Sequence, residues 1–238
     1  MLPIKFDVKL FLLLSLAFFV SVIVGTVSHE CGHYTVAKYL GYSSSIHYSY
    51  CIWDDESTRP FMDSVYTNYA KEVQANLNFP QKEKFNIIQQ KQMKDGFWIT
   101  LGGPLQTMFT GTLGLLLLLK QKKKINQTNN INLYQWFCIF LSLFWLRQFV
   151  NLFTWIIGYF INGNFKTHGD EIGLAMSLGL PIGTLIIFTA IIAFAISLFI
   201  FFKIVSSYKR VTFIAAGLFG GTVGYLFWLV WFGEIIMP

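Results

Sequence analysis

Charged residues are scarce in this chain. Asp, Glu, Lys and Arg together make up 13% of its 238 residues, against about 25% in typical soluble domains. Hydrophobic residues make up 54%, and 18% are aromatic. A soluble globule of this length would have too few polar side chains to cover its surface. We therefore predict an integral membrane protein whose apolar segments contact a lipid bilayer.

Signals for disulfides and for nucleic-acid binding are also missing. The three cysteines are an odd number and their spacing forms no disulfide framework, which excludes a small disulfide-stapled secreted domain. The formal net charge is +6, but the basic residues cluster beside apolar runs, as in KQKKK at 120–124 and YKR at 208–210. Such clusters are typical of membrane-flanking segments. Because no nucleic-acid motif accompanies them, nucleic acid is not expected as a partner.

The apolar segments divide the chain into about five transmembrane helices. We predict an all-α, polytopic helix bundle that forms one integral-membrane domain over residues 1–238 and lies in the cell membrane. The expected spans are a first helix at 9–40 and further helices at 97–119, 133–161, 181–205 and 211–236.

Residues 41–95 form the longest polar segment between two spans. Its 45–53 portion is rich in residues that favour strands, which predicts a small β-hairpin or a single strand. The 81–96 portion is weakly amphipathic, which predicts a helix at the membrane interface. Another short helix is expected at 171–179, just before the fourth span.

The first span ends in an HExxH sequence, His29-Glu30-Cys31-Gly32-His33. On a helix, positions i and i+4 share a face, so His29 and His33 can direct ring nitrogens at one metal ion. Glu30 lies about 100° around the helix from His29 and can act as general base on a zinc-bound water. Cys31 points away from the histidine face and is not expected to be a ligand. The alternative is that these are polar residues at a helix end in the interface, although buried ionisable groups in apolar helices usually mark function.

A catalytic zinc needs a third protein ligand and one open position. The segment before the fourth span offers His168, Asp170 and Glu171, of which we favour Asp170. Asp170 has an alternative role as the N-cap of the short helix that follows it. The acidic run at 54–56 is a further alternative, but it has the character of a solvated loop.

Two other groups of residues are candidates for substrate binding. Gly102, Gly103 and Pro104 predict either a helix start or exposed backbone that binds an extended peptide. Asn151, inside the third span, could bind substrate backbone or join two helices by hydrogen bonding. Arg147 in the same span is expected to form a structural ion pair, with a direct catalytic role as the alternative.

Taken together, these motifs resemble the site-2 protease family of intramembrane zinc metalloproteases over roughly residues 10–180. The resemblance implies that His29 and His33 bind zinc, that Glu30 is the catalytic acid/base, and that Asp170 is the third ligand. Gly103 and Pro104 match the family's Gly-Pro-x-x-Asn element, with Thr107 in place of its asparagine. The sequence HGDE stands where the family has a Pro-rich stretch ending in Leu-Asp-Gly.

These observations predict a zinc protease that cleaves membrane-embedded or membrane-adjacent peptide bonds. Its cofactor would be Zn²⁺, and its partners would be the lipid bilayer and a membrane protein or peptide substrate. One alternative is a non-proteolytic membrane protein, such as a metal-binding protein or a pseudo-protease. Another is a different HExxH membrane peptidase with Glu171 as the third ligand. The sequence does not specify an oligomeric state.

Overall fold

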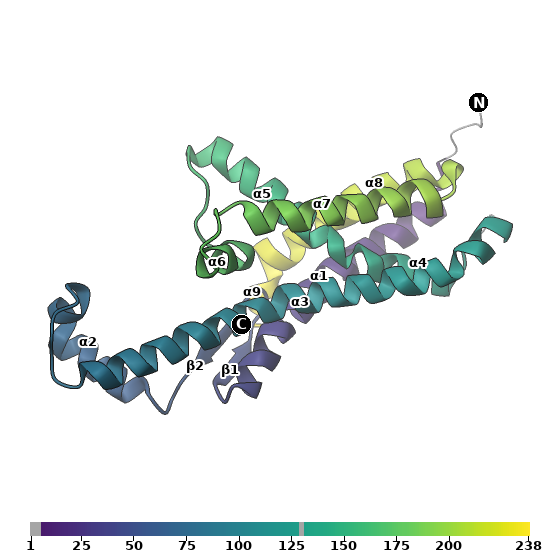
Figure 1. Cartoon of the computed structure of the whole chain (residues 1–238). Coiled ribbons are helices and arrows are strands. Elements are labelled where there is room, and N and C mark those ends of the chain that lie inside the picture. The colour runs from purple at the N-terminus through teal and green to yellow at the C-terminus, as the bar shows by residue number, and fades with distance from the viewer. Residues whose placement is uncertain (1–5, 129–130) are drawn as a thin grey trace.

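A computed structural model of the chain describes residues 6–128 and 131–238. It is an all-α helix bundle with one small antiparallel β-hairpin (Figure 1). The described residues contain five helical segments that are long and apolar enough to cross a membrane: Val8–Tyr39, Lys82–Ile125, Leu133–Asn162, Thr184–Ile204 and Ser207–Ile236. The predicted fold class, with about five spans and a hairpin in the long polar segment, is confirmed.

The first span is helix α1 (Val8–Tyr39). The Asp7 side chain caps its N-terminus by accepting a hydrogen bond from the Leu10 N–H at 2.9 Å. The helix ends next to Gly41, whose φ of +88° is accessible to glycine at little cost. Because α1 continues past its apolar part, the HExxH sequence lies on the last turns of an unbroken helix.

The hairpin follows α1 directly and consists of β1 (Ser43–Ile46) and β2 (Cys51–Asp54). Residues near the C-terminus hydrogen-bond to the loop of this hairpin. The Tyr48 N–H donates to the Met237 carbonyl at 3.0 Å, and the indole N–H of Trp228 donates to the Tyr48 carbonyl at 2.8 Å. The hairpin is therefore fixed beside the end of α1 by residues of the last span.

The polar segment and the second span differ from their sequence-based predictions. Helix α2 (Arg59–Gln74) was not predicted, and the expected helices at 81–96 and 97–119 are one continuous helix, α3 (Lys82–Thr128). The first turns of α3 pack against α2 in a small apolar cluster made up of Met62, Val65, Phe79 and Phe85. The expected break at Gly96 does not occur, and α3 stays helical there with open space beside the glycine.

The third span is interrupted. Helix α4 (Leu133–Ser142) leads through a 3₁₀ turn at Leu143–Trp145 into α5 (Leu146–Asn162). After a loop, the short helix α6 (Asp170–Ser177) precedes α7 (Thr184–Phe199). Figure 1 shows α6 and the hairpin at the same end of the bundle.

The last two spans end in wider, π-helical turns. One follows α7 at Ile200–Ile204, and another, at Leu226–Phe232, joins α8 (Arg210–Tyr225) to α9 (Gly233–Ile236). Helices α1 and α8 approach closely at Gly220. A Cβ added to this glycine would lie only 2.2 Å from the Ser15 carbonyl oxygen. Small residues therefore let these two helices pack backbone to backbone, as is common in membranes.

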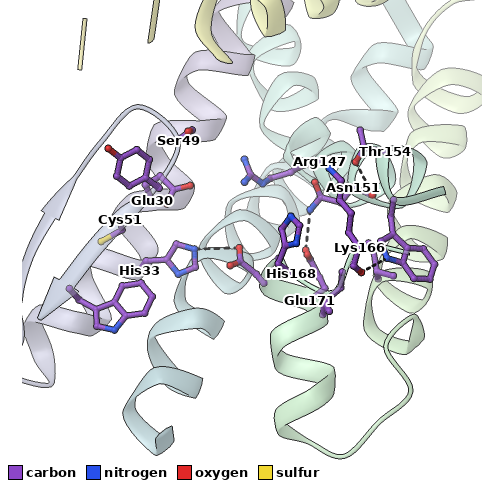
Figure 2. A pocket seen from close by; sticks show the side chains of 17 residues that line it. Glu30, His33, Ser49, Cys51, Arg147, Asn151, Thr154, Lys166, His168 and Glu171 are labelled. Carbon is purple, nitrogen blue, oxygen red and sulfur yellow. Dashed lines mark hydrogen bonds and ion pairs between the residues drawn. The ribbon is translucent and has the colours of Figure 1, made fainter. Parts of the chain in front are cut away.

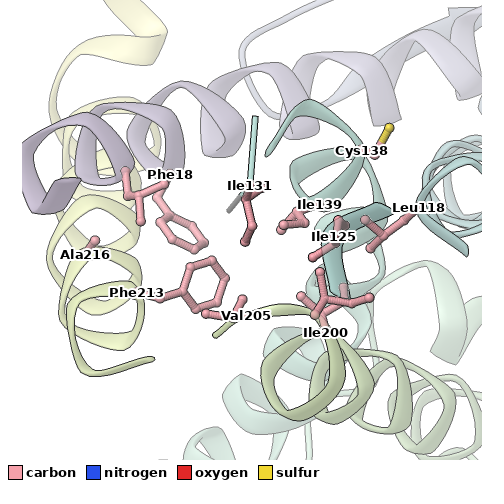
Figure 3. Close-up of a cluster of buried hydrophobic side chains, with 12 residues drawn as sticks. Phe18, Leu118, Ile125, Ile131, Cys138, Ile139, Ile200, Val205, Phe213 and Ala216 are labelled. Carbon is pink, nitrogen blue, oxygen red and sulfur yellow. The ribbon is translucent and has the colours of Figure 1, made fainter. Parts of the chain in front are cut away.

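The main apolar core (Figure 3) surrounds the first half of α1, whereas the hairpin follows the other end of that helix. Phe18 of α1 packs edge to face against Phe213 of α8, with ring centroids 5.4 Å apart. Buried side chains from α3, α4 and the turn after α7 complete the cluster, among them Leu118, Ile139 and Ile200. This cluster, called the apolar core below, holds the first half of α1, and the HExxH residues follow about 16 Å further along the helix.

Candidate metal centre

His29 and His33 lie side by side on α1 and are both buried, with 1% and 6% of their surfaces exposed. Their Nε2 atoms are 3.2 Å apart. Together with Glu30 they form a group that could hold a metal ion, in which one ligand atom from each residue lies within 4.8 Å of the others. The expected i, i+4 pairing of the histidines on one helix face is therefore present.

Asp170, at the start of α6, lies against the Nε2 atoms of both histidines. Its Oδ2 is 2.8 Å from His29 Nε2 and 3.4 Å from His33 Nε2. Burial raises the pKa of the Asp170 carboxyl, but the hydrogen bonds with His29 and His33 outweigh burial and hold that pKa well below its usual range. Asp170 is therefore an anionic oxygen donor at neutral pH.

The other ring nitrogen of each histidine has a fixed partner. His33 Nδ1 donates to the Ile99 carbonyl of α3 at 2.7 Å. His29 Nδ1 lies 2.9 Å from Thr107 Oγ1, and the Thr107 hydroxyl donates to the Gly103 carbonyl at 3.2 Å. Because the single hydroxyl proton of Thr107 is used there, its oxygen accepts from His29. With each Nδ1 engaged in this way, both Nε2 atoms face Asp170: a proton on Nε2 donates to the carboxylate, and an Nε2 without that proton presents a lone pair that can bind a metal ion.

The converging atoms match the donor set of a transition-metal site. Two imidazole nitrogens and a carboxylate oxygen face one another, an arrangement that either shared protons or a metal cation would stabilise. In tetrahedral zinc sites with ligand distances near 2.0–2.1 Å, the donors are about 3.3 Å apart. The three distances here, 2.8, 3.2 and 3.4 Å, are close to that value. The residues present therefore fit a zinc ion.

Glycines bring α3 against the histidines. A Cβ on Gly103 would lie 2.3 Å from His33 Nε2 and 2.6 Å from His29 Nε2. A Cβ on Gly32 would lie 2.4 Å from the Gly102 carbonyl oxygen. These positions need glycine because any side chain would displace the ligands or separate the two helices.

The expectation that Gly102, Gly103 and Pro104 form a helix start or exposed backbone is wrong. All three residues are buried inside the continuous helix α3. Their backbone is therefore no edge for an extended peptide. Helix α1 lies directly against them, since a Cβ on Gly102 would fall 2.6 Å from the Gly32 carbonyl oxygen.

The N-cap role considered for Asp170 is also wrong. Gly169 is the N-cap of α6, with a φ of +124°, and Asp170 is the first helical residue. Gly169 supplies a conformation that other residues rarely adopt, and this turns Asp170 toward α1. The Asp170 carboxylate therefore contacts the histidines and does not cap α6.

The other acids considered as ligands lie elsewhere. Glu171 is buried on the opposite wall, where its Oε1 accepts a hydrogen bond from Asn151 Nδ2 at 3.2 Å. Burial raises the pKa of Glu171, opposed in part by Asn151 and by the charge of Arg147. Asp54 forms an ion pair with Arg59 at 2.6 Å at the end of the hairpin. Of the acids considered as ligands, Asp170 is therefore the one whose carboxylate lies against both histidines.

A pocket of about 430 Å³ opens beside these residues (Figure 2). One wall is formed by Glu30 and His33 of α1 and by the hairpin, including Cys51 and Trp53. Burial raises the pKa of the Cys51 thiol to about 11, so this thiol stays neutral at physiological pH. His168, the remaining ligand candidate, lies on the pocket wall and is exposed.

The opposite wall is a polar stripe on α5. Arg147, Asn151, Thr154 and Trp155 all line the pocket, and their spacing of four, seven and eight residues places them on one helix face. Arg147 and Asn151 were singled out in the sequence, whereas Thr154 and Trp155 were missed. Helical spacing of polar residues within an apolar span would have found the stripe.

The predicted ion pair of Arg147 is not found. Within the described part of the chain no carboxylate oxygen lies within 4.0 Å of its guanidinium, and its buried Nε has no hydrogen-bond partner. The nearby acids are turned to other groups, Asp170 to the histidines and Glu171 to Asn151. Arg147 therefore enters the pocket as a half-buried cation.

No protein-family model, curated protein or solved structure matches this chain. Its function is therefore inferred from the HExxH sequence, from the resemblance that this sequence carries, and from the geometry of the pocket.

Proposed function

We propose that this protein is an intramembrane zinc metalloprotease. The observation that carries the proposal is the convergence of His29 Nε2, His33 Nε2 and Asp170 Oδ2, with Glu30 beside them on a pocket wall. Three protein ligands and an accessible pocket leave a position for water, as catalytic zinc sites require. When bound, zinc would polarise the substrate carbonyl and lower the pKa of water toward 7.

The protein's own residues supply orientation and proton transfer. Thr107 and the Ile99 carbonyl hold the histidine rings so that both Nε2 lone pairs face the same point. Glu30 is the proposed general base, which takes a proton from the attacking water and passes it to the leaving nitrogen. Pure metal binding needs no carboxylate at this position, so Glu30 favours catalysis over storage or sensing.

The surroundings of the pocket favour a peptide from a membrane protein as substrate. The five apolar helices would lie in the cell membrane, and the pocket opens between α1, α5, α6 and the hairpin. β2 contributes Cys51 and Trp53 to the wall, which places a short strand next to the proposed metal. An extended substrate segment could pair with that strand, because peptide bonds must leave a helix before they can be attacked.

Purified protein in liposomes tests the proposal. Single-span peptides of varied sequence serve as probes, with products read by mass spectrometry. Wild type should cleave some of them, whereas Glu30→Gln should retain zinc and lose at least about 100-fold in rate, as expected when a general base is removed. Glu56→Gln is the matched control, because Glu56 is exposed and lies outside the pocket.

Two results would contradict the protease. Cleavage that survives in purified Glu30→Gln would remove Glu30 from the mechanism. Zinc binding without cleavage of any peptide by wild type would favour the non-proteolytic alternative.

A further inference from the structure

Placing the charged side chain of Arg147 within the third membrane span costs free energy. A guanidinium stays charged at any physiological pH, and placing it within a membrane span is expensive unless it serves a function. Its Nε is buried without a hydrogen-bond partner within the described residues. Arg147 also lines the pocket and pairs with no described carboxylate, so its guanidinium is a group that a ligand oxygen could bind.

The nearby carboxylates do not satisfy Arg147. Asp170 is bound to His29, and Glu171 accepts from Asn151. Glu30 lies across the pocket, and the guanidinium end of Arg147 points toward that wall (Figure 2). The space between Glu30 and Arg147 therefore has a proposed base on one side and a fixed positive charge on the other.

The start of α5 is held rigidly. The 3₁₀ turn at Leu143–Trp145 ends two residues before Arg147, and the indole N–H of Trp145 donates to Thr112 Oγ1 of α3 at 3.2 Å. Gly111 provides space for that indole, because a Cβ there would lie 2.5 Å from Trp145 Cδ1. The backbone from which Arg147 projects is therefore fixed, which limits the reorganisation needed to bring its charge to a reacting oxygen.

We propose that Arg147 binds the carbonyl oxygen of the scissile peptide bond and stabilises the negative charge that this oxygen gains. This role rests on the proposed protease function. The water oxygen adds to the carbonyl carbon, the π electron pair moves onto the carbonyl oxygen beside Arg147, and the water proton passes to Glu30. The C=O bond then re-forms, the C–N bond breaks, and Glu30 returns the proton to the leaving nitrogen.

The other basic residues on the pocket wall are less suited to this role. Lys166 and His168 are exposed, whereas Arg147 is half-buried. Water screens an exposed charge and weakens its effect on a reacting oxygen. A guanidinium also offers several donors in a fixed plane, which suits an oxygen acceptor.

The test compares Arg147→Met and Arg147→Lys with the control Arg59→Met, whose guanidinium belongs to a surface ion pair away from the pocket. Each protein is reconstituted in liposomes and its zinc content measured. The probes are a single-span peptide that wild type cleaves and its phosphonamidate analogue, which replaces the scissile carbonyl by a tetrahedral anionic phosphorus group. Arg147→Met should keep its zinc, lose about 100-fold in kcat and bind the analogue about 100-fold more weakly, with KM changed less than about threefold.

Arg147→Lys, which keeps the charge, should recover part of kcat, and Arg59→Met should match wild type. Zinc-loaded Arg147→Met with kcat within about threefold of wild type would overturn the role. Equal losses in KM and in analogue affinity would overturn it too, since they indicate a structural defect. If Arg147→Met does not fold, Arg147→Lys decides: a kcat about tenfold below wild type supports the role, and an unchanged kcat overturns it. Absence of cleavage by wild type overturns the proposed function itself.

Discussion

Helix α1 passes through two regions that are held together in different ways. Around Phe18 it packs against apolar side chains from several other helices. Around His29 it meets α3 through glycines and is joined to α3 and α6 by directed hydrogen bonds. Apolar packing tolerates small adjustments, whereas converging ligand atoms do not. We therefore expect changes in the first region to affect stability and changes in the second to affect metal binding.

The largest effect is expected for Gly103→Ala. The added Cβ would fall 2.3 Å from His33 Nε2, in the space where the ligands meet. Metal content measured by mass spectrometry should fall below about a tenth of wild type, because a zinc site tolerates only small shifts of its ligands. The control is Gly96→Ala in the same helix, where nothing lies within 4 Å. Full zinc content in Gly103→Ala would mean that the histidines are not the ligands.

A smaller effect is expected for Thr107→Val, which removes the hydroxyl that accepts from His29 Nδ1. Loss of such a partner typically weakens metal affinity by about 10- to 100-fold. Competition with a zinc chelator measures the change. The matched control is Thr35→Val, since Thr35 is on the exposed side of α1 and its hydroxyl donates to the Cys31 carbonyl. Equal zinc affinities for the two variants would show that Thr107 does not orient the ring.

Phe18→Ala tests the apolar core. Loss of its ring contacts with Phe140 and Phe213 should cost about 2 kcal/mol of stability, below the range for soluble cores because lipid is itself apolar. Thermal unfolding in detergent should show a lower Tm, while zinc content at 25 °C should match wild type. If zinc is lost in folded Phe18→Ala, the two regions of α1 are not independent.

The smallest effect is expected at Cys51 on the hairpin wall. Because burial raises the pKa of this thiol to about 11, only about one thiol in a thousand is ionised at pH 8. Iodoacetamide should therefore label Cys51 slowly at pH 8 and faster as the pH rises toward 11. Mass spectrometry of the labelled peptide measures the rate. Rapid labelling at pH 7 would show that water reaches this wall freely.

Much of the fold could be predicted because the bilayer imposes a strong pattern. Long apolar runs gave the spans, and β-favouring residues at 45–53 gave the hairpin. Helix α2 was missed because its stability depends on a tertiary cluster with the start of α3. The continuity of α3 was missed because the chain changes from polar to apolar residues at Gly96, although one helix runs through both stretches.

The site was predictable where its spacing lies within one helix. His29, Glu30 and His33 follow from the sequence, because i and i+4 share a face. The choice of Asp170 over Glu171 depends on the left-handed turn at Gly169, which no spacing rule reveals. The tautomer partners, Thr107 and the Ile99 carbonyl, come from another helix. Partners brought together only by helix packing leave no periodic signal in the sequence.

The zinc content of three purified proteins tests the proposed metal centre most directly: wild type, Asp170→Ala and Glu171→Gln. Asp170 Oδ2 contacts both histidines, whereas Glu171 is hydrogen-bonded to Asn151 on the opposite wall. We predict about one zinc per chain in wild type and in Glu171→Gln, and a large loss in Asp170→Ala. Wild type without zinc, or zinc retained in Asp170→Ala and lost in Glu171→Gln, would contradict this centre.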